Sequence, residues 1–172
     1  MIQVKTFILD PKIQYPGIVG QELLENFFID IEEPSRETEL RGIFAGGGNI
    51  YACILITQDD KVILNDEVLE RVPLYWIIWA DLLEDYLAME DGNDVVSIEP
   101  YFSLEKKAND TILLIYSGGV FSFHLPEKEF LLSVLQGGMN FFRKYQGLNP
   151  GAIIDHAAEE KINRLIPLAK NL

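Results

Sequence analysis

The sequence holds few of the side chains that build metal centres, disulfides and catalytic sites. Among its 172 residues are one cysteine, Cys53, and two histidines, His124 and His156. One cysteine cannot form an intramolecular disulfide, and a zinc site would require the fold to gather all three of these scattered residues. We therefore expect no disulfide, no metal site and no cofactor, so that the apolar core must stabilise the fold.

Long hydrophobic runs are also missing. No uninterrupted apolar run exceeds seven residues, the length of 74–80, whereas a helix that spans a bilayer needs about 20. The opening residues MIQVKTFILDP lack the basic start, the long apolar middle and the small-residue cleavage site of a secretion signal. We therefore expect a cytoplasmic protein that does not bind membranes.

Basic side chains are scarce relative to acidic ones. The chain has 14 Lys and Arg against 27 Asp and Glu, a net charge of −13. Residues 1–100 hold 20 of the acids but 6 of the bases. An acidic field repels nucleic acid and speeds encounter with basic partners. We therefore expect a basic protein partner and no nucleic acid; the alternative is that acidity only keeps the protein soluble.

No catalytic motif is complete. The glycine-rich stretch at 45–49 is followed by a strand and lacks the Lys-Ser or Lys-Thr of a nucleotide-binding loop, so we interpret it as an inter-strand turn. Cys53 has apolar neighbours and nothing that lowers its pKa. His124 alternates with Ser122 on a predicted strand, which leaves their side chains parallel and favours a polar strand face.

What is present is a clear strand pattern. The segment 50–57 is apolar on both faces, which predicts a strand in the centre of a sheet. The polar stretch 33–39 contains a proline and is predicted to be a loop. Turn residues before 61–64 and 120–125 predict two hairpins. The predicted strands are 2–9, 26–32, 50–57, 61–64, 95–102, 111–117 and 120–125.

Three segments have the apolar face of a helix. Prolines suit the first turns of the helices predicted over 73–89 and 126–147. A last helix is predicted over 149–166, ended by Pro167. Strand, hairpin and helix therefore occur twice in the same order, through duplication or through ordinary covering of a sheet. We predict a single α+β domain over 1–172, an antiparallel sheet of six or seven strands with two main helices on one face and a C-terminal helix.

The helix predicted over 73–89 carries the main candidate contact surface. Its acidic side chains are interpreted as a solvated face, a protein-contact surface or ligands for a divalent cation. Its tryptophans suit the core, but the apolar face is so wide that one edge is expected at the surface, where tryptophan is a favoured interface anchor. The predicted partner-binding residues are Asp59, Asp60, Asp66, Trp76, Trp79, Asp81, Glu84 and Asp85.

Charge and size together favour a non-catalytic protein-binding module. An inhibitor of the immunity type, which neutralises a basic toxin such as a nuclease, is the leading hypothesis, because an acidic surface can occupy a groove built for phosphates. The alternatives are an accessory subunit of a larger assembly and a small hydrolase or ligand-binding enzyme whose site is not motif-like. For the enzyme, His124 would be the residue to examine.

Overall fold

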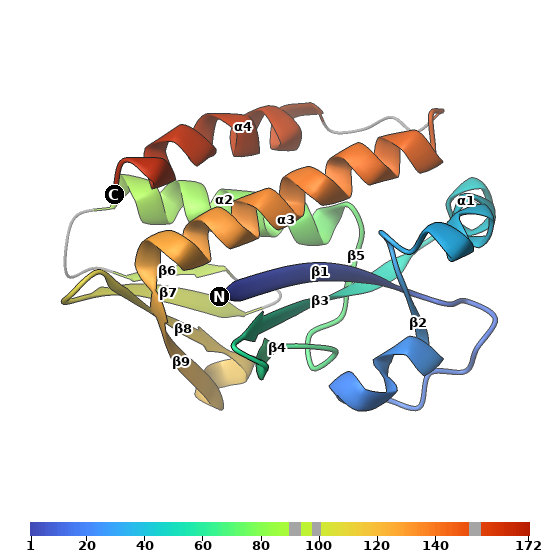
Figure 1. The fold of residues 1–172 in the computed structure, drawn as a ribbon, viewed down its shortest axis with the longest axis horizontal. Coiled ribbons are helices and arrows are strands. Elements are labelled where there is room, and N and C mark those ends of the chain that lie inside the picture. Colours follow the sequence, from blue (N-terminus) through green and yellow to red (C-terminus); the bar gives the residue numbers. More distant parts are fainter. Residues whose placement is uncertain (90–93, 98–100, 152–155) are drawn as a thin grey trace.

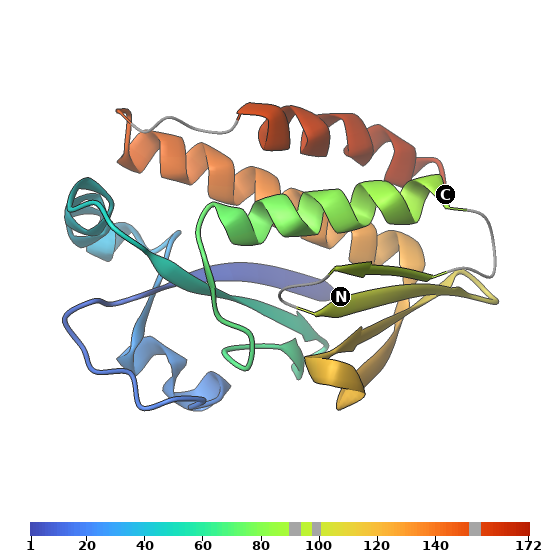
Figure 2. The same ribbon diagram turned by 180° about the vertical axis from the view of Figure 1, so that it is seen from behind.

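The structure is a computed structural model that describes residues 1–89, 94–97, 101–151 and 156–172. It confirms the α+β class, with antiparallel sheets and three long helices. Figures 1 and 2 show α2 and α3 packed side by side over the sheets, with α4 lying on top of both. The long helices are α2 (Leu74–Ala88), α3 (Glu127–Leu148) and α4 (His156–Lys170).

The first sheet is built around two long neighbouring strands, β1 and β3. Ile8 of β1 pairs with Ala52 of β3 on one side and with Ile29 of β2 on the other. The strand order is β2-β1-β3-β4, and β5 also pairs with β3. The strands are β1 (Ile2–Leu9), β2 (Phe28–Asp30), β3 (Tyr51–Gln58), β4 (Lys61–Leu64) and β5 (Glu70–Arg71).

The remaining strands form a second sheet, which divides the single sheet that the sequence predicts. The two sheets meet through side chains: the Tyr116 hydroxyl donates to the Ile63 carbonyl oxygen at 2.8 Å. The strand predicted over 95–102 is also divided, with 98–100 outside the described residues. In the order β6-β7-β8-β9 the strands are β6 (Asp94–Ser97), β7 (Phe102–Lys107), β8 (Thr111–Tyr116) and β9 (Phe121–Pro126).

A helix replaces the loop predicted over 33–39. A 3₁₀ turn, η2 (Pro34–Arg36), leads directly into α1 (Glu37–Ala45). The Glu33 side chain accepts a hydrogen bond from the Ser35 backbone N–H at 3.3 Å, and proline is tolerated in a first helical turn. Leu40 and Phe44, four residues apart, are buried. The helix is thus fixed by the apolar side chains of its second half, of which Leu40 and Phe44 are buried and Ile43 packs against the core.

The last helix also differs from its predicted bounds. It continues through Pro167 to Lys170. Two contacts, one apolar and one polar, stabilise this last turn. Ala169 is fully buried, and the Lys128 ammonium donates to the Lys170 carbonyl oxygen at 2.6 Å. The predicted start at Asn149 is wrong, because this residue follows the last turn of α3; of the predicted helix, 152–155, which include Ile154, lie outside the described residues. The predicted buried side is confirmed for Ala158, Ile162 and Leu165.

The core is assembled around α2, whose two tryptophans contact different sheets. Trp76 Nε1 donates to Thr6 Oγ1 of β1 at 3.2 Å, while the Trp79 ring lies 4.7 Å, centroid to centroid, from Phe102 of β7. Helix α3 approaches the same region through Gly137 and Gly138. A side chain at either glycine would collide with its neighbours, so these glycines allow the close crossing of α3 with α2, α4 and β1.

Ion pairs join α2 to α4 on their solvent side. Lys161 Nζ lies 2.5 Å from Asp81 Oδ1 and 2.8 Å from Glu84 Oε2, and Arg164 also contacts Glu84. These contacts orient α4 above α2, in addition to the apolar side that α4 buries. In the part of the chain that the structure describes, no helix has the length and apolar character to cross a membrane.

Replacing Gly138 with alanine is expected to lower the free energy of unfolding by about 1 kcal/mol. The added Cβ would lie 2.9 Å from both Ile162 Cδ1 and Trp76 Cε3. Overpacking costs about 1–3 kcal/mol, which exceeds the roughly 1 kcal/mol that alanine gains over glycine inside a helix. Urea denaturation measures the change. Gly42→Ala in α1, where nothing lies within 4 Å of the new Cβ, is the control and is expected to stabilise.

The Glu84 ion pairs are expected to make stability depend on pH below about 4.5. The hydrogen bond from Lys161, with a further one from Arg164, lowers the pKa of Glu84. A lowered folded pKa gives a contribution that is complete above the unfolded pKa and is lost as the pH falls through the folded value.

We therefore expect Glu84→Gln to lower the unfolding temperature at about pH 7 and to have almost no effect near pH 3. Circular dichroism during heating measures both values. The control is Asp85→Asn, since Asp85 is exposed on the same helix. A deficit in Glu84→Gln that persists unchanged to low pH would contradict the role of the ion pairs.

Candidate functional site

Three of the predicted partner-binding residues lie inside the fold. Trp76 and Trp79 are each 1% exposed and Asp66 is 2% exposed. The expectation that the aromatic edge of α2 reaches the surface is therefore wrong, because the sheets cover one side of this helix and α4 covers another. Neither the two indole rings nor the Asp66 carboxylate is available to a partner in this conformation.

The other five predicted residues do not form one patch. Asp81 and Glu84 contact cations of α4, and Asp85 is exposed on α2. Asp59 and Asp60 instead form the turn between β3 and β4, both with positive φ. Side chains of β1 alternate between the helix side and the opposite side of the first sheet, here called the outer face. Asp60 borders a groove on that outer face.

Asp66 holds the segment 11–27, here called the covering segment, on the outer face. Its carboxylate accepts hydrogen bonds from the Tyr15 hydroxyl at 2.8 Å, the Val19 N–H at 2.7 Å and the Gly20 N–H at 3.2 Å. Burial, with the hydrogen bond to Asp66, raises the pKa of Tyr15. Asp66 is therefore a structural anchor. The segment that it fixes encloses a second small core of Phe7, Leu24, Phe28, Cys53 and Leu55.

Cys53 belongs to this small core and is not a nucleophile candidate. Its side chain is fully buried, and burial raises the pKa of the thiol. The thiolate, which is the reactive form of cysteine, is therefore disfavoured at neutral pH. The prediction that Cys53 packs between apolar neighbours on a strand is confirmed.

A groove opens where the covering segment ends, and we call it the Lys5 groove. Its volume is about 280 Å³, and its buried lining side chains, Phe7, Leu24 and Leu55, give it an apolar floor below a mainly polar rim. Polar side chains come from β1, from β3 and from the 3₁₀ helix η1 (Gln21–Asn26) of the covering segment. The groove is lined by Gln3, Lys5, Phe7, Gln21, Leu24, Glu25, Leu55, Thr57 and Asp60.

Carboxylates outnumber cations around this groove. Lys5 Nζ lies 2.9 Å from Asp30 Oδ2, and this hydrogen bond, aided by the charges of Glu32 and Glu25, raises the pKa of Lys5. Glu25 and Asp60 are exposed at the groove. Among the described residues neither of these two carboxylates forms an ion pair. The groove therefore presents an apolar floor with free negative charge at its sides.

A second hollow, the Asp10 cavity, lies where β1 leaves the sheet. Its volume is about 290 Å³, and its walls come from the end of β1, the chain that follows, α1, the glycine-rich stretch and the start of β3. Gly47 forms part of the wall with φ of 68°. The lining residues are Leu9, Asp10, Pro11, Ile13, Tyr15, Ile43, Gly47, Asn49, Ile50 and Tyr51.

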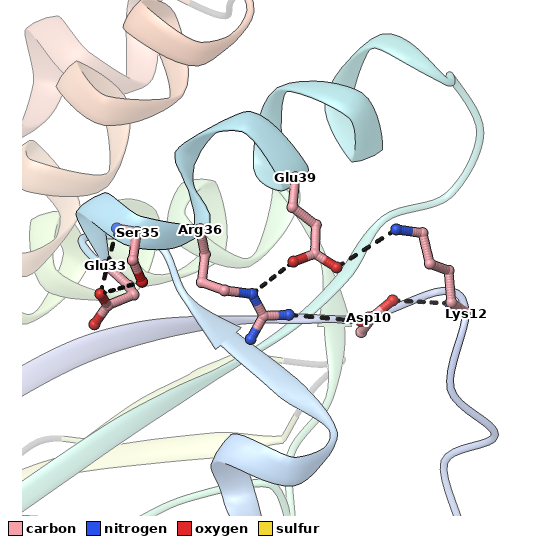
Figure 3. Close-up of polar contacts among 6 residues, drawn as sticks. All are labelled: Asp10, Lys12, Glu33, Ser35, Arg36 and Glu39. Carbon is pink, nitrogen blue, oxygen red and sulfur yellow. Dashed lines mark hydrogen bonds and ion pairs between the residues drawn. The ribbon is translucent and has the colours of Figure 1, made fainter.

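An ion-pair network fixes α1 against this cavity (Figure 3). Arg36 Nε donates to Glu39 Oε2 at 2.5 Å, and Arg36 Nη2 lies 3.7 Å from Asp10 Oδ2. Lys12 Nζ lies 3.5 Å from Glu39 Oε1. None of these four residues is among the predicted contact residues, because Arg36 and Glu39 were predicted to lie in a loop and Asp10 and Lys12 follow the predicted first strand. The one sequence signal for this network was Asp10, a carboxylate that directly follows the apolar residues of β1.

Asp66→Ala is expected to lower the free energy of unfolding by about 2–4 kcal/mol, because hydrogen bonds to charged groups contribute about 1.5–3 kcal/mol and the loss orphans three donors. The covering segment should loosen, so that trypsin cuts after Lys12 faster. Urea denaturation and mass spectrometry of the digest measure the two effects. The control Asp60→Ala changes an exposed carboxylate and should shift stability by less than about 0.5 kcal/mol. Unchanged cleavage in Asp66→Ala would refute the anchoring role.

The side chains that line the Lys5 groove and the Asp10 cavity are suited to binding a ligand. In the described part of the chain, no histidine, cysteine or serine lines either of them, and His124 is exposed on β9. Their polar groups are carboxylates, amides, hydroxyls and one lysine ammonium. Comparison with known proteins found no family model, no curated protein and no solved structure that matches the chain.

Proposed function

We propose that this protein is a non-catalytic module that binds a basic protein at the Lys5 groove. The observation that carries the proposal is the combination of an apolar floor with the free carboxylates of Glu25 and Asp60. Lysine and arginine have an aliphatic stem and a cationic end. The stem would lie on the floor of the groove, and the charge would reach the carboxylates at its sides.

The pairing of cations within the first 100 residues supports this proposal. Five of their six basic side chains contact carboxylates of the same chain. The sixth, Lys61, lies 5.1 Å from the centroid of the Phe123 ring. Among the described residues of this region, several acids form no ion pair, Glu25 and Asp60 among them. A partner that supplies cations would be attracted over a distance of roughly 10 Å at 0.1 M salt.

Exposed apolar side chains on the covering segment support a protein partner over a small cation. Ile18 is 66% exposed and Leu23 is 48% exposed. Leu23 belongs to η1, the same short helix that supplies Glu25 to the groove. An apolar contact beside complementary charge is the usual arrangement of a protein interface, in which charge directs encounter and burial of apolar surface adds affinity.

The immunity-type inhibitor is the form of this proposal that fits the charge best. A nuclease binds phosphates in a basic groove, and the carboxylates beside the Lys5 groove would occupy the same positions as those phosphates. Such a complex would form rapidly at low salt and weaken as salt rises. In the accessory-subunit alternative, a permanent and more apolar interface would resist high salt.

The test is capture of the partner from native cell extract at about 50 mM and about 500 mM salt, where charge-guided binding is strong and weak respectively. The captured protein is then purified and its affinity measured by calorimetry. We expect a basic protein, bound at the lower salt and weakened at the higher one. Glu25→Lys combined with Asp60→Lys should reduce the affinity at least about tenfold.

The matched control is Asp85→Lys combined with Glu160→Lys, which changes the net charge equally on exposed positions of α2 and α4. The control should bind within about twofold of wild type if contact at the groove, and not overall charge, decides affinity. Equal losses in both variants would reject the groove as the contact surface. Capture of no basic protein at either salt would reject the proposed function.

A further inference from the structure

The Asp10 carboxylate is buried and has unused capacity to accept hydrogen bonds. The residue is 4% exposed. Its Oδ1 accepts a hydrogen bond from the Lys12 backbone N–H at 2.9 Å. Its Oδ2 lies 3.7 Å from Arg36 Nη2, which is an ion pair but too long for a hydrogen bond. A carboxylate has about four acceptor positions. Asp10 Oδ2 is not among the buried side-chain atoms of the described residues that have no partner, so it keeps some contact with solvent and can accept a hydrogen bond from a bound molecule. Among the described residues, Oδ2 has no donor at hydrogen-bonding distance.

This carboxylate lines a cavity whose other walls are mainly apolar. Isoleucines come from the chain after β1, from α1 and from the position just before β3, and two tyrosine rings complete the wall. The volume of about 290 Å³ is roughly twice that of a 150 Å³ protein cavity that holds benzene. A molecule of one or two rings would therefore fit. Mainly apolar walls with a few polar groups, here including Asp10 and Asn49, are typical of small-molecule sites.

The surrounding charges select the kind of polar group that the ligand carries. Arg36 already lies beside Asp10, and Lys12 is part of the same network, so a cationic ligand would meet like charge (Figure 3). An anionic ligand would be repelled by Asp10 itself. A neutral donor, such as a hydroxyl or a ring N–H, satisfies Oδ2 without disturbing the ion pairs. Hydrogen bonds to a charged acceptor are among the stronger ones in proteins.

The cavity is shaped before any ligand arrives. Arg36 and Lys12 fix α1 to the end of β1 through Glu39. On its other side α1 is held by α3, where the Phe44 and Tyr145 ring centroids lie 4.9 Å apart. Ile43 of α1 is thereby placed in the cavity wall. A wall fixed from two sides lowers the entropic cost of ordering it around a ligand.

We propose that the Asp10 cavity binds a free, uncharged aromatic molecule of one or two rings that donates one hydrogen bond, through a hydroxyl or a ring N–H, to Asp10. The site is separate from the Lys5 groove and does not depend on the proposed basic partner. Its failure would leave the proposed function intact, and the reverse also holds.

The test is a titration of the ¹⁵N-labelled full chain with indole, followed by amide chemical shifts. We expect shifts that saturate and that are concentrated on residues of the cavity, such as Ile13, Ile43, Gly47 and Asn49. The matched probe 1-methylindole has the same rings without the N–H donor. It should bind at least about tenfold more weakly, since a hydrogen bond to a charged group is lost.

Two variants separate the cavity from the carboxylate. Ile43→Trp fills the cavity and should abolish the indole shifts, whereas Leu168→Trp, at an exposed position of α4, should leave them unchanged. Asp10→Asn keeps the size of the side chain, removes its charge and should erase most of the preference for indole over 1-methylindole. Shifts outside the cavity, no saturable shifts, or equal binding of the two probes to wild type would overturn the proposal.

Discussion

The fold depends on one contact region, in which two tryptophans of a single helix each reach a different sheet. Trp76 and Trp79 are three residues apart, so they share one side of α2. One of them contacts β1 and the other contacts β7. Loss of a large buried aromatic side chain costs about 3–5 kcal/mol, which is a large part of the 5–15 kcal/mol that stabilises a typical domain. Helix α2 therefore joins the two sheets, together with α3, which contacts β1, β8 and β9, and with the hydrogen bond of Tyr116 to Ile63.

This arrangement decides where the candidate sites lie. All three long helices are on one side of the sheets (Figures 1 and 2), so no long helix protects the outer face of the first sheet. An irregular segment covers part of it, anchored by the carboxylate of Asp66. This segment covers the sheet incompletely, and both the Lys5 groove and the Asp10 cavity lie beside the segment. Binding surface and structural cover are thus made by the same residues.

The sequence predicted elements far better than it predicted exposure. Apolar patterns and turn residues located β1, β3, the hairpins, α2 and α3, because those signals are local. Helix α1 was missed since its burial depends on two side chains, Leu40 and Phe44. The division into two sheets was missed because strand pairing is a property of the whole chain.

The same limit applies to the candidate contacts. The acidic character of the chain is evident from its sequence. The burial of Asp66, however, depends on the covering segment, which lies some 50 residues earlier in the chain. Conversely, Glu25 and Asp60 are 35 positions apart and meet only because β1 pairs with β3 and η1 packs over them. Asp10 and Arg36 meet in the same way. The net charge can be counted from the composition, whereas the residues whose charges lie close together are decided by the fold.

The tryptophan pair has a further consequence for spectroscopy. The chain has two tryptophans, and both are at these sheet contacts. Their indole N–H groups differ: that of Trp76 is hydrogen-bonded to Thr6, while that of Trp79 has no partner among the described residues. The two indole N–H protons should therefore have different chemical shifts in a proton NMR spectrum. Each reports on the packing of one sheet, so that both sheets can be followed without isotope labelling.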